Sequence, residues 1–196
     1  QLILNKYPVQ KGHILLITNS WRPQNGWLDI NDWIAMQKVN YDTSGLWFFN
    51  SSPAAGASQP HRHFQLLRRA EGELSCPREK WFLRLINVRD SFCKIEKNII
   101  VSEFNFFKSS SFIYKKYLNL SKELGLGDPL KDKKPKHPYN ILITNEWIAM
   151  VKRKQDHLHG FSINGLGFAG YILVTEKSNV NYLKKNGPVK LLENFV

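Results

Sequence analysis

The sequence predicts an α+β fold built on a mostly antiparallel sheet, with helices packed on one face. Two observations favour this class: short apolar runs pair as hairpins around turn residues, and a few longer segments have the helical spacing of apolar residues. The chain has 196 residues, of which 42% are hydrophobic, so it can bury a sizeable core.

Local patterns predict the elements of the first half in order. Residues 2–18 are expected to form a hairpin, because a turn containing Pro8 and Gly12 separates two apolar runs. Residues 31–39 have the spacing of a short helix with an acidic first turn. Residues 45–50 and 61–68 should form strands on either side of a loop rich in Ser, Pro, Ala and Gly.

The second half is expected to mix helices and hairpins. The pattern predicts helices at residues 79–88 and 112–124, a strand at residues 98–107, a hairpin at residues 139–151 and a strand-rich segment at residues 162–174. Gly, Pro and Lys gather at residues 127–137, which is typical of a solvated loop.

Composition limits the classes of function. The formal net charge of +12 favours the capture of polyanions, but it does not separate a nucleotide from a nucleic acid or a lipid surface. Apolar runs stay well below the roughly 20 residues that a membrane-spanning helix requires, so we expect no membrane partner. Cys76 and Cys93 lack the spacing and the histidine partners of a zinc site, which favours a reducing cytoplasm and no metal held by protein ligands.

A phosphate-sized loop is expected between the first two central strands. Asn50 ends one strand, and the small residues Gly56 and Ala57 follow it, which would let backbone N–H groups approach an anion closely. Ser58 and Gln59 add neutral donors without a bulky side chain.

The strand after this loop carries the pattern that indicates chemistry. Side chains alternate along a strand, so His61, His63 and Gln65 should share one face. A neutral imidazole has a free lone pair, so His63 can attack an α-phosphorus and form a covalent nucleotidyl-histidine. By itself, His-x-His-x-Gln is more often a plain polar sheet face, and it is Asn50 and the loop before it that favour the catalytic interpretation.

Gln65 indicates the kind of leaving group. An amide donates hydrogen bonds but cannot act as a general acid or base at neutral pH, so the leaving group must depart without a proton from that position. A nucleoside polyphosphate is such a leaving group. An acceptor that is already nucleophilic, such as inorganic phosphate, also suits this site better than water.

Three stretches of the chain resemble a known family. Residues 50–67 resemble the active-site segment of the histidine-triad superfamily, in the branch where Gln replaces a third histidine, as in galactose-1-phosphate uridylyltransferases. The Gly-Ala-Ser-Gln-Pro-His form looks like the diadenosine tetraphosphate phosphorylases, also called ATP adenylyltransferases. Residues 5–18 and 139–170 contain further stretches that resemble these phosphorylases.

The resemblance implies a reaction and a set of roles. Diadenosine tetraphosphate and phosphate would give ATP and ADP, with the adenylyl group carried by His63, supported by His61 and held by Gln65. The expected nucleotide and phosphate contacts are Asn50, Gly56, Ala57, Ser58, Gln59, Lys6, Asn164 and Lys152. Magnesium would accompany only the polyphosphate, and the partners would be small-molecule nucleotides.

The same resemblance suggests how the chain is organised. Residues 1–126 would form a histidine-triad-like catalytic region, and residues 127–196 an ATP adenylyltransferase-like region packed into the same globular unit. Two other functions stay open: nucleotidyl exchange with a sugar 1-phosphate, and non-enzymatic nucleic-acid binding by the basic surface. The second leaves the histidine pattern unexplained.

Overall fold

The computed structural model describes residues 1–70, 72–86 and 95–196. Within these residues, one sheet contains seven strands, and neighbouring strands run antiparallel. In order across the sheet, they are β1 (Leu2–Leu4), β2 (His13–Ile17), β4 (His63–Arg68), β3 (Gly45–Asn50), β6 (Tyr139–Ile143), β7 (Trp147–Lys152) and β5 (Ile99–Glu103). Strands β8 (His157–Leu158) and β9 (Phe161–Ser162) form a separate ribbon.

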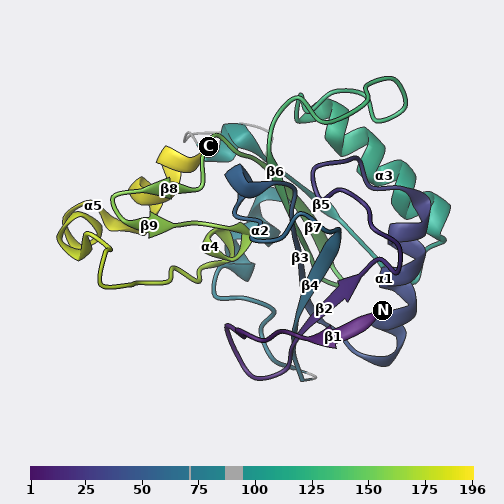
Figure 1. Cartoon of the computed structure of the whole chain (residues 1–196), viewed down its shortest axis with the longest axis horizontal. Helices are drawn as coiled ribbons and strands as arrows, with labels where there is room; N and C mark the ends of the chain where they lie inside the picture. Colours follow the sequence, from purple (N-terminus) through teal and green to yellow (C-terminus); the bar gives the residue numbers. More distant parts are fainter. Residues whose placement is uncertain (71, 87–94) are drawn as a thin grey trace.

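Helices lie on both faces of the sheet (Figure 1). One face, here called the α1 face, packs against α1 (Ile30–Asp42) and α3 (Ser110–Glu123). The other, the α4 face, packs against α2 (Glu79–Ile86), α4 (Gly165–Ala169) and α5 (Val180–Leu192). The remaining helical turns are η1 (Pro53–Ala55), η2 (Glu96–Asn98) and η3 (Glu193–Phe195).

The α+β class with a mostly antiparallel sheet is confirmed, but the expectation of helices on a single face is wrong. The reason lies in the central strands, which are apolar on both sides. All five residues of β6 are buried, with Ile141 in the core on the α1 face and Leu142 in the core on the α4 face. Two such faces both require a covering layer.

Most of the expected elements occur, with shifted ends. The hairpins β1–β2 and β6–β7 are present, and α1 begins one residue after Asp29, whose side chain caps it together with Asp32. The strand-rich segment expected at residues 162–174 is wrong beyond β9, because Asn164 caps α4 by accepting from the N–H of Leu166 at 2.9 Å. Residues 87 and 88 of the expected second helix lie outside the described residues, as does Cys93.

A buried ion pair fixes α1 against β4. Arg62 precedes β4 and donates to Asp32 of α1 across 2.9 Å, and both side chains are about 95% buried. The same guanidinium donates to the carbonyl of Pro23. Burial raises the pKa of Asp32, although the positive charge of Arg62 opposes this. The pair therefore fixes the start of β4 to α1 on the α1 face of the sheet.

We expect Asp32→Ala to lower the free energy of unfolding by about 3–5 kcal/mol, because it leaves the Arg62 charge buried without its carboxylate. Arg22→Ala is the control, since Arg22 pairs with Asp29 where both side chains are more than one-third exposed; its cost should stay below about 1 kcal/mol. Urea unfolding of both variants measures the difference. Equal costs would contradict a structural role for the buried pair.

Candidate functional site

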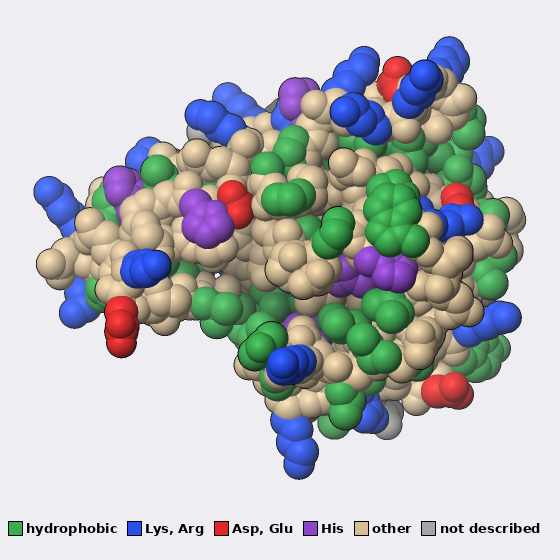
Figure 2. Space-filling model, viewed as in Figure 1, with side chains coloured by type: hydrophobic (Ala, Val, Ile, Leu, Met, Phe, Trp, Pro, Cys, Tyr) green, Lys and Arg blue, Asp and Glu red, His purple; other side chains and the backbone are tan. Residues whose placement is uncertain are grey.

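The expected site lies at the end of the sheet where the central strand β3 ends and its neighbour β4 begins. Because these strands are antiparallel, Asn50 and His63 come to the same end, where Asn50 pairs with Asn140 of β6. Phe64 belongs to the core on the α1 face, so His63 and Gln65 face the α4 side, as the predicted alternation requires. Figure 2 shows histidine side chains near the middle of this view of the surface, next to hydrophobic ones.

His63 is held in the tautomer that a nucleophile needs. Its Nδ1 lies 2.8 Å from the carbonyl oxygen of His61. A carbonyl can only accept, so Nδ1 carries the proton and Nε2 has a free lone pair. The residue is 6% exposed, and burial lowers the pKa of the His63 imidazole, with the nearby His61 charge adding to the effect and the backbone hydrogen bond opposing it. The ring is therefore neutral near pH 7.

Gln24 joins the two strand ends on which the site is built. Its side-chain oxygen accepts from the backbone N–H of His63 at 2.9 Å, and its Nε2 donates to the carbonyl of Asn50 at 2.7 Å. Gln24 is itself 3% exposed. A buried amide with these partners fixes the distance between the backbone of His63 and that of Asn50.

The sequence did not indicate that His13 belongs to the site. His13 of β2 is 2% exposed, and its Nδ1 lies 3.3 Å from the N–H of Val9, which can only donate. The proton of a neutral His13 ring is therefore on Nε2, which donates to Oε1 of Gln65 at 3.0 Å. Burial lowers the pKa of His13, with the His63 charge adding to this and the bond to Gln65 opposing it.

The bond from His13 sets the orientation of the Gln65 amide. Its oxygen faces His13, so its NH2 group is the end left to donate, and Nε2 makes no hydrogen bond within the described parts of the chain. Gln65 can therefore donate to a phosphoryl oxygen held next to His63. The signal in the sequence was weak, because His13 opens an otherwise apolar strand, His-Ile-Leu-Leu-Ile.

Asn50 is oriented in the same way from the other side. Its Oδ1 accepts from the backbone N–H of Gly165 at 3.0 Å and from Nδ2 of Asn140 at 2.8 Å. Its own Nδ2 is buried and has no hydrogen-bond partner among the residues that the structure describes. A buried donor without a partner is costly, which is consistent with a ligand oxygen completing this bond.

The loop between β3 and β4 differs in detail from the expectation. The N–H groups of Gly56 and Ala57 donate to the carbonyls of Pro53 and Ser52, at 2.8 and 2.9 Å, so they close a turn and are not free for an anion. Gly56 has φ +86°, and a Cβ there would lie 2.7 Å from the Cα of Asn164. Its role is close packing of the loop on α4.

Exposed donors follow this turn. The side chains of Ser58 and Gln59 are exposed and make no hydrogen bond within the described residues; their role as phosphate donors stays a prediction. Asn164 packs against the same loop through Gly56 while it caps α4. Ser58, Gln59 and Asn164 thus lie at the end of the sheet where β3 ends and β4 begins.

Three further expected residues have other surroundings. The His61 ring lies 2.9 Å from the Thr18 hydroxyl, so His61 supports His63 through its carbonyl and not through its ring. Lys6 is exposed in the turn between β1 and β2, next to Asn5, whose amide contacts the His13 ring. Lys152 alternates with Met150, which belongs to the core on the α1 face, so it lies on the opposite side of the sheet from His63.

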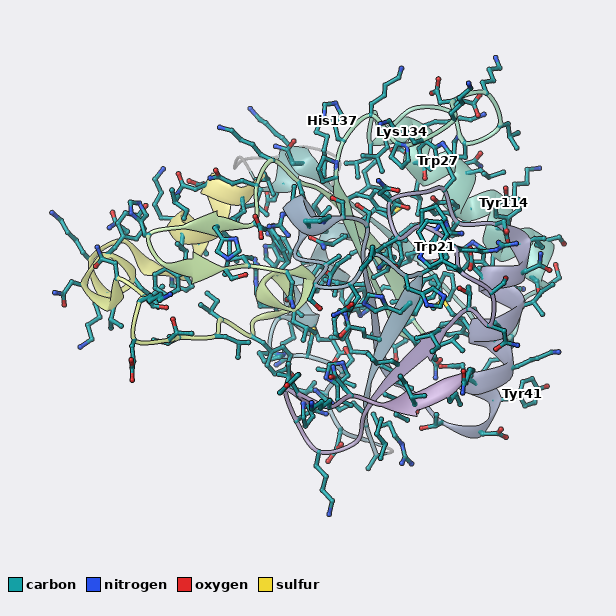
Figure 3. The ribbon with its side chains drawn as sticks, in the orientation of Figure 1. Trp21, Trp27, Tyr41, Tyr114, Lys134 and His137 are labelled. Carbon is teal, nitrogen blue, oxygen red and sulfur yellow. The ribbon has the colours of Figure 1, made fainter. Side chains whose placement is uncertain are left out.

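The basic segment expected as a solvated loop is exposed. Lys134 and His137 project outward from the connection between α3 and β6 (Figure 3), and Lys131, Lys133 and Lys136 are exposed as well. Around this view of the molecule, lysines and arginines outnumber acidic side chains at the periphery (Figure 2). This distribution favours approach of an anionic ligand.

Among the described residues, no cluster of three or more His, Cys, Asp or Glu side chains could hold a metal ion. Within the same residues, no helix has the length and apolar content needed to cross a membrane. Cys76 is a buried free thiol, and burial raises its pKa to about 11, so it is a poor nucleophile.

Together these features define a site at the ends of two central strands of an antiparallel sheet, with a neutral, oriented histidine and side-chain amides that can donate to a ligand. Residues 1–80 match the model of the Ap4A (diadenosine tetraphosphate) phosphorylase N-terminal domain. Residues 74–196 match the model of the ATP adenylyltransferase C-terminal domain. The chain therefore belongs to the Ap4A phosphorylase and ATP adenylyltransferase family.

Two curated relatives come from Saccharomyces cerevisiae. Protein APA1 is 26% identical over 205 residues, which cover 88% of this chain and 60% of that protein. Diadenosine 5',5'''-P1,P4-tetraphosphate phosphorylase 2 is 23% identical over 223 residues, which cover 95% of this chain and 65% of that protein. The chain thus spans about two thirds or less of the length of these relatives.

Solved structures show the same fold. The crystal structure of yeast Ap4A phosphorylase Apa2 in complex with AMP has a TM-score of 0.72 and 24% identity, covering 96% of this chain and 69% of that one. Apa2 in complex with Ap4A gives a TM-score of 0.72 and 24% identity, covering 98% and 70%. The likeness shows that the sheet and its helices are arranged as in Apa2.

The two buried neutral histidines predict a loss of stability in acid. The folded-state pKa values of His13 and His63 lie below 6.5, so the unfolded chain binds more protons as the pH falls below that value. The free energy of unfolding should fall there by up to about 1.4 kcal/mol per pH unit for each histidine. Chemical denaturation between pH 7.5 and 5 measures this slope. His63→Gln should reduce it, and an unchanged slope in that variant would contradict a buried neutral ring.

Proposed function

We propose that this chain transfers an adenylyl group through His63, cleaving diadenosine tetraphosphate with phosphate to give ATP and ADP. Nε2 of His63 attacks the α-phosphorus of one adenosine end and forms an N–P bond. The P–O bond from this phosphorus to the rest of the polyphosphate breaks, which releases ATP. An oxygen of inorganic phosphate then attacks the same phosphorus, which gives ADP and frees His63. Together the two steps consume one inorganic phosphate and regenerate the free His63 ring.

One observation carries this proposal: the bond from Nδ1 of His63 to the His61 carbonyl. It leaves the ring neutral, with its lone pair on Nε2, and Gln65 on the same face of β4 keeps an NH2 group that can donate to a ligand. The Gln65 amide cannot protonate a leaving group, so weakly basic polyphosphate is the leaving group that fits. The names of the yeast relatives and the Apa2 complexes with Ap4A and AMP support the same substrate class.

The proposal extends to the surroundings of the reaction. The donors around His63 are neutral amides and hydroxyls, so any magnesium would arrive with the polyphosphate and not through protein ligands. We propose a cytoplasmic, reducing setting, in which the Cys76 thiol stays reduced in the core. Nucleotides are the proposed partners.

We expect His63→Gln to abolish covalent labelling by adenine nucleotides and to lower phosphorolysis of diadenosine tetraphosphate by at least about 10³-fold, because the nucleophile is lost. Incubation with diadenosine tetraphosphate and phosphate, followed by separation of the nucleotides, measures turnover. His137→Gln is the matched control, since His137 is exposed on the basic loop and should leave both signals intact.

The same assay separates the alternatives. Full turnover by His63→Gln would remove His63 from the mechanism. Preference for a sugar 1-phosphate over phosphate as acceptor would assign the chain to nucleotidyl exchange with sugars. Tight, steeply salt-dependent binding of single-stranded RNA without any nucleotide turnover would favour the nucleic-acid-binding alternative.

A further inference from the structure

The strongest unexplained group outside the reacting atoms is Arg153. It follows β7 directly and is 2% exposed, although it lies between two lysines, Lys152 and Lys154, in the sequence. Its guanidinium lies 5.0 Å from the Phe168 ring centre and 5.7 Å from that of Phe195. A buried arginine is costly unless its donors are well used, so its partners indicate its role.

Among the residues that the structure describes, the hydrogen-bond acceptors of Arg153 are all neutral oxygens. Its nitrogens donate to the carbonyls of Phe195, Gln155 and Ile163 at 3.1, 2.7 and 2.8 Å. Nη1 donates to Oδ1 of Asn140 at 2.5 Å and more weakly to the carbonyl of Ala55 at 3.4 Å. Burial lowers the pKa of Arg153 to about 10, with Asp156 opposing the shift, so it remains charged at pH 7.

The bond to Asn140 determines the orientation of two amides in sequence. Arginine can only donate, so Oδ1 of Asn140 faces Arg153 and Nδ2 faces the loop, where it donates to Oδ1 of Asn50 and to the Ala55 carbonyl, both at 2.8 Å. The N–H of Gly165 also donates to Oδ1 of Asn50. Nδ2 of Asn50 is thereby left as the free donor.

We infer that Arg153 is a positioning residue for phosphate binding, which acts through Asn140 to present the side-chain N–H group of Asn50 to a phosphoryl oxygen. The inference rests on the proposed function and goes further by naming the residues that orient the Asn50 amide toward the phosphate. The five-donor fork is required for this, because it must reach Asn140 while it also bonds carbonyls from three segments. A lysine keeps the charge but cannot make these bonds together.

The test uses inorganic tripolyphosphate as the ligand and compares Arg153→Lys with the full chain. The positive charge is retained, so a weaker affinity reports lost orientation and not lost charge. We expect about a 10- to 100-fold increase in the dissociation constant, the range for losing a hydrogen bond to a charged group. Titration calorimetry measures it, and Ile113→Val in α3, on the other sheet face, controls for general destabilisation.

A double-mutant cycle distinguishes positioning from a merely structural role. In an Asn50→Ala background, Arg153→Lys should cause little further loss, because the donor it orients is already absent. The same factor of loss in both backgrounds, or wild-type affinity in Arg153→Lys, would overturn the inference. If Arg153→Lys does not fold, Asn140→Leu takes its place in the cycle with the same two outcomes.

This result can be separated from the proposed function. Tripolyphosphate binding needs no turnover, so the cycle reads Arg153 even if His63 forms no adenylyl adduct. Conversely, adduct formation on His63 with no coupling between Arg153 and Asn50 would leave the proposed reaction standing and remove this inference.

Discussion

The hydrogen bond between Nδ1 of His63 and the carbonyl of His61 decides which ring nitrogen can react. It depends on the backbone at the start of β4, which the Gln24 amide ties to the end of β3. With Nδ1 engaged, the lone pair is on Nε2, and burial keeps the ring uncharged. Within the described residues, Gln65 and Asn50 each keep a side-chain N–H group that can donate to a ligand.

Alternation along β4 places an ion pair on one face of the sheet and the His63 imidazole on the other. Arg62 faces α1 and forms a buried ion pair there, whereas His63, the next residue, faces the α4 side. Phe64 again faces the core. The ion pair therefore anchors β4 from the α1 face, on the opposite side of the strand from the His63 ring.

Much of this arrangement could be predicted from the sequence because it is local. The period of two placed His63 and Gln65 on one face, and turn residues placed the hairpins. What pairs distant segments could not be predicted in this way. His13 occurs in an apolar strand, and Arg153 lies in a charged run that resembles surface, yet both are buried only because other segments pack over them. The short helix α4 depends likewise on the loop that Gly56 packs against it.

The number of helix-covered faces was also open to local reasoning. The apolar runs of β6 and β7 are continuous, which is typical of strands buried on both faces. Weighted more heavily than the hairpin signals, they would have predicted two layers of helices.

Strand β6 lies in the sheet between β3 and β7, although its residues follow those of β3 by about ninety positions in the sequence. During synthesis on the ribosome, the edge of β3 therefore waits unpaired until residues 139–143 emerge. Such long-range pairing slows folding and leaves a strand edge that can recruit other chains meanwhile. The loop that carries Ser58 packs against Asn164, so its surroundings are complete only at that late stage, well after His63 has emerged.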